Sequence, residues 1–297
     1  YNIKVNKTIT IYRAFSHFLP EGIIDDLIHK DSEKELMTGE KRSIVVIFCH
    51  IKQFGKILEH NDPQAIVNFL NAHFTNMVTI IQSHGGIIDK FIGDAVFAIF
   101  GAPISYKDNA LRAANASVEM IKKFKNIDTN KVKFTKEGFS IGIGINEGDA
   151  IIGNIGCSDK FDYTAIGDTV NLAARLESLT KHYKRNILIS ENINKKIDKL
   201  HFTRMVDTAK VKGKNQSTNI FSLEINPVPF TKDWADAYQK GLKMYHIGNW
   251  FTAREYFQIA SEINPDDFPT IQYQQRCNMF IEAPPDNWEG AVTLDFK

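Results

Sequence analysis

Three polar side chains in this sequence stand where they could act on an anionic group. Asp94 lies in the segment FIGDAV at the tip of a predicted hairpin, where a carboxylate can face a shared site. Asn171 and Arg175 are four residues apart in the predicted helix TVNLAARLES, so both project from one face. Arginine is always charged, and its fork of donors suits a phosphate group. The simpler alternatives are a turn aspartate and an ordinary pair on a helix surface.

The elements around these residues predict an α+β fold. Residues 43–51 (SIVVIFCHI) are typical of a buried central strand, and residues 62–85 predict a long amphipathic helix with Asp62 as N-cap. Two strands in GGIIDKFIGDAVFAIFG come next, then a helix at about residues 108–124, then two strands joined near Gly148. The order βαββαββ indicates a ferredoxin-like split βαβ arrangement, with a largely antiparallel sheet covered by helices on one face.

Three parts of the chain are expected. Residues 1–40 form a lead-in segment with a short helix from Pro20 to His29, residues 41–226 form the α+β domain, and residues 230–297 form a helical tail. From Trp234 the spacing of small and aromatic residues is similar to one tetratricopeptide unit, a helix pair of about 34 residues. One such unit cannot bury its own apolar face, so we expect the tail to dock on something, such as a protein partner.

Composition narrows the class of protein. Of 297 residues, 43% are hydrophobic and 24% charged, which is typical of a globular chain with a real core. Thirty-six Lys and Arg against 35 Asp and Glu leave a net charge of +1, so nothing favours general nucleic-acid binding. The cysteines, Cys49, Cys157 and Cys277, are too widely spaced for a disulfide framework or a CxxC zinc site. They indicate a reducing, cytosolic setting.

No segment is predicted to span a membrane. The longest apolar run, residues 43–51, has about 9 residues, whereas a spanning helix needs roughly 20. Because the chain begins at Tyr1 without a signal-peptide pattern, we expect a fragment of a longer cytoplasmic protein. The cytosolic part of a membrane-anchored protein is the open alternative.

The segments DKFIGDAVFAIFGAP, GIGINEGDAIIGNIG and YTAIGDTVNLAARLES together resemble the class III nucleotidyl cyclase catalytic domain, over roughly residues 40–225. The resemblance implies a head-to-tail homodimer with a nucleotide at the interface, where one chain supplies the metal ligands and the other the base-reading and transition-state residues. The ribose 3′-hydroxyl attacks the α-phosphate in line. Two Mg²⁺ or Mn²⁺ ions bridged by two carboxylates activate that oxygen and neutralise the developing charge.

The resemblance places Asp94 at the second metal aspartate and Ile51 among the metal-binding positions. The first metal aspartate should end the first strand, but this chain reads FCHIKQFG, with His50 in its place. Mg²⁺ prefers anionic oxygen ligands, so a neutral imidazole compromises a two-metal site. Two interpretations stay open: His50 binds a softer cation such as Mn²⁺, or it fills space at a strand end without a ligand role.

The phosphate-binding positions are altered in the same loop. Gln53 replaces the glycine and Gly55 the threonine of the family pattern, and Phe54 between them falls on a substrate-binding position. Lys212, in KVKGKN, falls on the lysine that contacts the terminal phosphates, although both other lysines of that segment lie close enough to take its place.

The base-reading and transition-state positions are intact. The resemblance places Lys90 and Thr164 at the base-reading pair: an ammonium donates to adenine N1, and a threonine hydroxyl accepts from the adenine amino group. ATP is therefore favoured over GTP. Asn171 falls on the residue that positions the ribose, and Arg175 on the one that stabilises charge on the α-phosphate.

Three functions are compatible with this pattern. The first is an adenylyl cyclase that forms cyclic AMP and pyrophosphate from ATP, with an impaired or Mn²⁺-preferring site because of His50. The second is a pseudocyclase that binds nucleotide without turnover. The third is an interaction module in which the cyclase fold serves as a signalling dimer scaffold. The retained residues favour the first.

Overall fold

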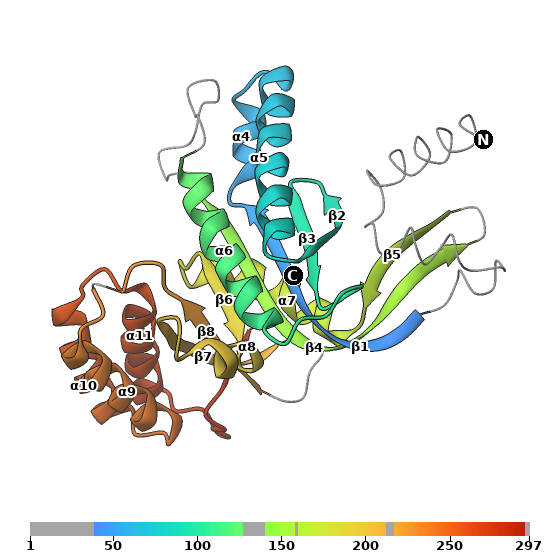
Figure 1. The fold of residues 1–297 in the computed structure, drawn as a ribbon. Helices are drawn as coiled ribbons and strands as arrows, with labels where there is room; N and C mark the ends of the chain where they lie inside the picture. Colours follow the sequence, from blue (N-terminus) through green and yellow to red (C-terminus); the bar gives the residue numbers. More distant parts are fainter. Residues whose placement is uncertain (1–38, 127–139, 158–159, 212–216, 228, 295–297) are drawn as a thin grey trace, which may run out of the picture. The chain divides into compact units, whose positions relative to one another are not determined.

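The computed structural model describes residues 39–126, 140–157, 160–211, 217–227 and 229–294. The chain divides into two compact units, Tyr1–Arg175 and Leu176–Lys297, which are described separately (Figure 1). The predicted lead-in helix from Pro20 to His29 lies outside the described residues. Among the helices that the structure describes, none combines the length and hydrophobicity needed to cross a bilayer.

The first unit is built on an antiparallel sheet. Its strands are β1 (Gly39–Ile51), β2 (Ile87–Ile92), β3 (Ala95–Phe100), β4 (Ile141–Cys157) and β5 (Lys160–Ile166). β1 pairs with β3 on one edge and with β4 on the other, β2 pairs with β3, and β5 pairs with β4. The four residues from Ile44 to Ile47 are buried completely or almost completely, as predicted for a central strand. The α+β prediction is confirmed.

The helices of this unit are α4 (Phe54–Glu59), α5 (Pro63–Ser83) and α6 (Asn109–Lys125). α5 begins as predicted, because the Asp62 carboxylate accepts hydrogen bonds from the backbone N–H groups of Gln64 and Ala65. α5 and α6 pack against each other and against the sheet, side by side (Figure 1). The ring of His73 on α5 lies edge-on to the ring of Phe124 on α6, with their centres 5.2 Å apart, and both residues are buried.

One predicted break in the sheet is wrong. β4 runs without interruption through Gly148 and Asp149, which pair with Ile44 and Ser43 of β1. A Gly-Asp pair permits a turn, but a long partner strand continues the ladder on both sides of it. Gly148 has a packing role instead, since an added Cβ would lie 2.8 Å from Oγ1 of Thr169. The strand that follows, β5, was not predicted.

The second unit combines a small sheet with helices. Its elements are β6 (Ile187–Ser190), α8 (Glu191–Ile197), β7 (Thr203–Val211), β8 (Ser217–Leu223), α9 (Lys232–His246), α10 (Trp250–Ile263), α11 (Phe268–Glu282) and β9 (Val292–Leu294). The strand order is β6-β8-β7-β9, and the helix α7 (Asp168–His182) leads into this unit. β7 contains a bulge: Met205 pairs with Phe221 and Asp207 with Ile220, so one residue between them is left over.

The helical tail differs from the predicted two-helix unit. α9 and α10 pack together as expected, but a third helix, α11, packs against α10. Tyr273 and Cys277 of α11 share one buried cluster with Trp234 and Tyr238 of α9 and Phe257 of α10. The tail therefore buries its aromatic face largely within its own three helices, and the tetratricopeptide-like prediction is not confirmed.

A buried charge network joins α11 to the sheet of the second unit. Asp267 caps α11 by accepting from the backbone N–H of Thr270, and its other oxygen accepts from Arg185 and from Nη2 of Arg204, the latter at 2.6 Å. The carboxylate is 0% exposed. Nε of Arg204 also donates to Glu224 at 3.1 Å. Two cations and two anions thus neutralise one another away from solvent.

Removing one member of this network should be costly. We expect Asp267→Asn to lower the free energy of unfolding by about 3–5 kcal/mol, because two buried guanidinium groups lose their shared anion. The neighbouring Asp266 is exposed, so Asp266→Asn should change it by less than about 0.5 kcal/mol. Urea unfolding of both variants measures the difference; equal effects would show that the network contributes no stability.

His73 gives the first unit a pH dependence. Its ring is 0% exposed and packs near the rings of Phe69, Phe74 and Phe124, and neither ring nitrogen has a hydrogen-bond partner among the described residues. Burial lowers the pKa of His73 to about 4, against a smaller opposing effect of the Asp94 charge. The neutral ring is therefore the form that the folded chain accommodates.

Stability should consequently fall as the solution is acidified. Between pH 6.5 and 4 the unfolded chain binds a proton at His73 that the folded chain does not, so the free energy of unfolding decreases with falling pH. We expect a loss of about 2 kcal/mol from pH 7 to pH 5. In urea unfolding, His73→Leu should remove this loss, and His60→Gln, at an exposed histidine, should keep it. The same slope in both variants would refute the assignment.

Candidate active site

Asp94 lies at the tip of the β2–β3 hairpin, next to the end of β1. Gly93 makes the turn with φ of 63°, a left-handed conformation that glycine adopts without strain. The Asp94 carboxylate accepts a hydrogen bond from the backbone N–H of Ile51 at 3.2 Å and lies 3.1 Å from Nε2 of His50. Asp94 is 8% exposed, whereas the His50 side chain is 45% exposed. All three residues of the predicted metal site therefore meet here.

The ligands at this point do not fit the two-metal arrangement that the resemblance implies. His50 supplies an imidazole nitrogen where a second carboxylate is expected, and Asp94 is the one carboxylate of the set. No cluster of three or more His, Cys, Asp or Glu side chains suited to a metal ion occurs in the described part of the chain. One carboxylate and one imidazole can contact a single cation, but they cannot bridge two.

The loop after β1 contains a residue in a backbone conformation that favours glycine, at the position where the resemblance implies one. Gln53 has φ of 60° and ψ of 27°, in the left-handed region, and it precedes the first residue of α4, Phe54. A side chain in this conformation costs about 1–2 kcal/mol relative to glycine's freedom. Gly55 has no atom within 4 Å of an added Cβ, so a threonine would fit there. The turn is therefore one that glycine would adopt without strain, and Gln53 adopts it at a cost.

Lys90 and Thr164 meet around a third residue, Asp89. Nζ of Lys90 lies 3.2 Å from Oδ1 of Asp89 and 3.6 Å from Oδ2 of Asp162. Oδ2 of Asp89 accepts from the backbone N–H of Ala165 at 3.2 Å. Burial raises the pKa of Asp89, while the Thr164 hydroxyl and the Lys90 ammonium act against that rise. The two predicted base-reading residues thus share one buried carboxyl group.

The predictions from sequence did not include Asp89. A partial signal was present, because Asp89 directly precedes Lys90 in the segment DKFIGD. Its side chain is 0% exposed, and an acidic residue is rarely buried without a partner. The strand that carries Thr164 and Ala165, β5, was not predicted, so their contacts with Asp89 could not be foreseen.

Asn171 and Arg175 lie on α7, whose start is fixed by two side-chain contacts. Oγ1 of Thr169 donates to the Asp149 carbonyl at 2.6 Å, and Nδ2 of Asn146 donates to the Thr169 carbonyl at 2.9 Å. Asn171 is exposed and Arg175 half-buried. Among the described residues, neither side chain makes a hydrogen bond or ion pair with Asp94 or Lys90. One chain alone therefore does not assemble all the predicted site residues through such contacts.

Two predicted substrate-binding residues remain. Phe54 is half-buried at the start of α4. Lys212 lies outside the described residues, as does Lys214, while Lys210 near the end of β7 forms an ion pair with Glu289. The assignment of Lys212 to the terminal phosphates therefore stays a prediction.

Comparisons with known proteins agree with the fold and with the motifs. The family model for the adenylate and guanylate cyclase catalytic domain matches residues 36–224. Adenylate cyclase, terminal-differentiation specific, from Dictyostelium discoideum is 36% identical over 258 residues, which is 82% of this chain and 12% of that protein. Adenylate cyclase from Anabaena cylindrica is 34% identical over 229 residues, 75% of this chain and 45% of that protein.

A solved structure shows the same architecture. The adenylyl cyclase CyaB from P. aeruginosa superimposes with a TM-score of 0.58 at 30% identity, over 63% of this chain and 96% of that chain. This chain spans less than half the length of the two curated relatives named above. Since the family model covers the strands and helices that carry Asp94, Lys90, Thr164 and Arg175, the chain belongs to the adenylate and guanylate cyclase catalytic domain family.

Proposed function

We propose that this chain is an adenylyl cyclase domain that binds ATP between two copies of itself and forms cyclic AMP and pyrophosphate. The observation that carries the proposal is the meeting of Lys90 and Thr164 around Asp89, since the two residues are far apart in sequence and both match the family's base-reading pair. The relatives named adenylate cyclase support the same choice of product.

Base choice follows from the donors and acceptors at this position. The Lys90 ammonium donates to adenine N1, which is an acceptor, whereas guanine carries a hydrogen at N1 and would oppose it. The Thr164 hydroxyl accepts from the adenine amino group. Asp89 is a positioning residue, because its buried carboxyl group holds the ammonium and the hydroxyl on the same side of the sheet.

In the proposed reaction, the ribose 3′-oxygen forms a bond to the α-phosphorus as the bond to the bridging oxygen breaks. Pyrophosphate leaves with that electron pair, and the hydroxyl proton passes to solvent. Asn171 of the second copy orients the ribose, and the Arg175 guanidinium stabilises the charge on the α-phosphate oxygens. Among the described residues, neither Asn171 nor Arg175 makes a hydrogen bond or ion pair with Asp94 of the same chain, which supports their action across a dimer.

Divalent cations supply charge neutralisation and activation of the 3′-oxygen in such reactions. The ligands that the described residues offer, one carboxylate and one imidazole, do not fit a pair of cations. His50 and Asp94 would contact a single cation, and we propose that turnover is low or requires Mn²⁺ for this reason.

A second function is favoured by one observation. The His50 imidazole is hydrogen-bonded to the Asp94 carboxylate at 3.1 Å, a contact that competes with cation binding by both groups. A pseudocyclase that binds ATP and dimerises without turnover is the alternative that this contact supports.

The two functions are separated by measuring cyclic AMP formation by the purified chain, in Mg²⁺ and in Mn²⁺. We expect His50→Asp to raise the rate in Mg²⁺ at least tenfold, which corresponds to about 1.4 kcal/mol of transition-state stabilisation. Adding Gln53→Gly and Gly55→Thr should raise it further, and Asp94→Ala should abolish it. His60→Asp, at an exposed histidine, is the matched control and should have no effect. A triple variant that binds ATP yet stays inactive would support the pseudocyclase.

Base selection is tested separately by binding. A non-hydrolysable ATP analogue should bind at least tenfold more tightly than its GTP counterpart, because an unpaired buried donor costs about 1–3 kcal/mol. Lys90→Met should remove most of this difference, whereas Lys160→Met, at an exposed lysine of β5, should preserve it. Equal affinities for both analogues in calorimetry of the parent would remove the base-reading roles and leave the family assignment untouched.

A further inference from the structure

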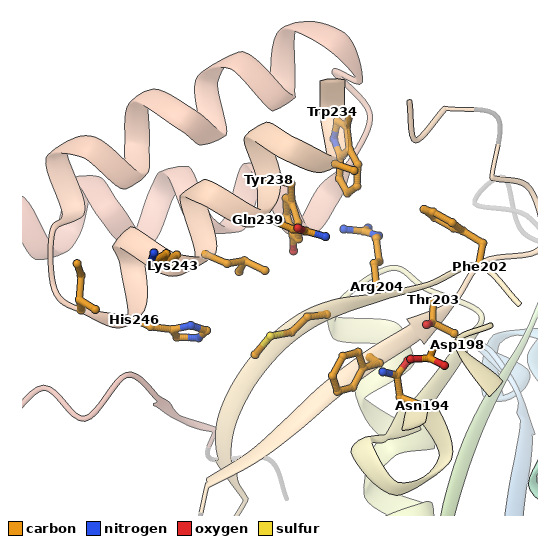
Figure 2. A pocket seen from close by; sticks show the side chains of 15 residues that line it. Asn194, Asp198, Phe202, Thr203, Arg204, Trp234, Tyr238, Gln239, Lys243 and His246 are labelled. Carbon is orange, nitrogen blue, oxygen red and sulfur yellow. The ribbon is translucent and has the colours of Figure 1, made fainter. Parts of the chain in front are cut away.

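A cavity of about 630 Å³ lies in the second unit, between α9 and the elements α8, β7 and β8 (Figure 2). Its size falls within the range of small-molecule sites, roughly 300–1,000 Å³. Much of the lining is apolar, from Phe202, Met205, Phe221 and Leu242. None of the residues predicted to contact nucleotide or metal lines it.

Four buried polar atoms of the lining have no hydrogen-bond partner within the described residues. Three are donors, Nη1 of Arg204, Nε1 of Trp234 and the hydroxyl of Tyr238, and the fourth is an acceptor, Oδ1 of Asn194. Arg204, Trp234 and Tyr238 are 7%, 1% and 2% exposed. Buried donors in folded proteins are almost always satisfied, so their clustering on one cavity points to a molecule that satisfies them.

The three donor side chains, Arg204, Trp234 and Tyr238, lie close together. Cζ of Arg204 is 5.1 Å from the centre of a Trp234 ring and 5.3 Å from the centre of the Tyr238 ring. Figure 2 shows the Arg204 side chain reaching from β7 toward Tyr238 and Gln239 of α9. The other guanidinium nitrogens are engaged, Nε with Glu224 and Nη2 with Asp267. Nη1 is thus the one nitrogen of this group left for a ligand among the described contacts.

The three donor atoms favour a ligand that accepts hydrogen bonds. Arginine and indole nitrogens can only donate hydrogen bonds, and burial raises the pKa of Tyr238, so its hydroxyl keeps its proton and also donates. An oxygen acceptor next to a guanidinium binds most strongly when it is ionised. At the lining, Lys243 and Asp198 carry opposite charges and offset each other. Arg204 is already paired with Glu224 and Asp267, so the preference for an anion depends on the charge-assisted hydrogen bond that its remaining nitrogen, Nη1, can donate.

We propose that this cavity binds a small carboxylic acid with an apolar body, as the carboxylate. The carboxylate oxygens accept from Arg204, Trp234 and Tyr238, and the apolar body lies against Phe202, Phe221 and Leu242. This site is separate from the cyclase function proposed above and does not depend on it.

Calorimetry of the full chain with two carboxylates of different shape, octanoate and 2-naphthoate, tests the site. 2-Naphthylmethylamine, which has the same ring and a positive charge, is the control ligand. We expect saturable binding of at least one carboxylate and at least tenfold weaker binding of the amine. If neither carboxylate binds saturably, or if the amine binds equally well, the proposal is wrong.

Variants locate the binding. Tyr238→Phe removes one donor that has no protein partner, so it should weaken carboxylate binding about fivefold to tenfold without lowering the unfolding temperature. Tyr245→Phe, on the same helix but outside the lining, should bind like the parent. Ala235→Phe should fill the cavity and abolish binding while leaving the polar groups in place. Unchanged binding by both Tyr238→Phe and Ala235→Phe would place the carboxylate elsewhere and overturn the assignment.

Discussion

Strand β1 is paired along both edges, and this constraint places the candidate metal residues. Its register with β3 sets Cys49 opposite Val96, which brings Ile51 level with Asp94 at the hairpin tip. Its register with β4 extends from Gly39 to Ile51. Both faces of β1 are buried from Ile44 to Ile47, so a slip of one residue on either edge would move each of these side chains into the packing of the opposite face, and the register is strongly fixed. The contact between His50 and Asp94 is therefore set by the sheet rather than by either side chain.

The same constraint bears on the loop after β1, where the resemblance implies phosphate contacts. Where β1 ends, the chain must turn sharply into α4, and the left-handed residue Gln53 makes that turn. A residue other than glycine in this conformation raises the energy of the backbone. The candidate site therefore combines the family's fold with an imidazole where the resemblance implies a carboxylate.

Features with local signals could be predicted from the sequence. The start of α5 follows from Asp62 and Pro63, and the β2–β3 turn follows from Gly93. Features fixed by distant partners could not. The Gly148–Asp149 pair resembles a turn until its partner strand, about a hundred residues earlier, is considered. The role of Asp89 depends on its hydrogen bond with β5, which the sequence did not predict. The third tail helix was missed because its glutamines weaken the apolar pattern.

The bulge in β7 determines which charged side chains of that strand can face the helical tail. In a regular strand, residues at odd separation point to opposite sides, so Arg204 and Asp207 would be divided between the two faces. The extra residue of the bulge places Arg204 and Asp207 on the same side of the sheet, because their partners Ser222 and Ile220 are two residues apart. A cation and an anion of one strand can then both meet α11, through Asp267 and Arg276. A chain cut after residue 226 would leave Arg204 and Asp207 without their partners Asp267 and Arg276. The tail is therefore not a detachable module of this unit.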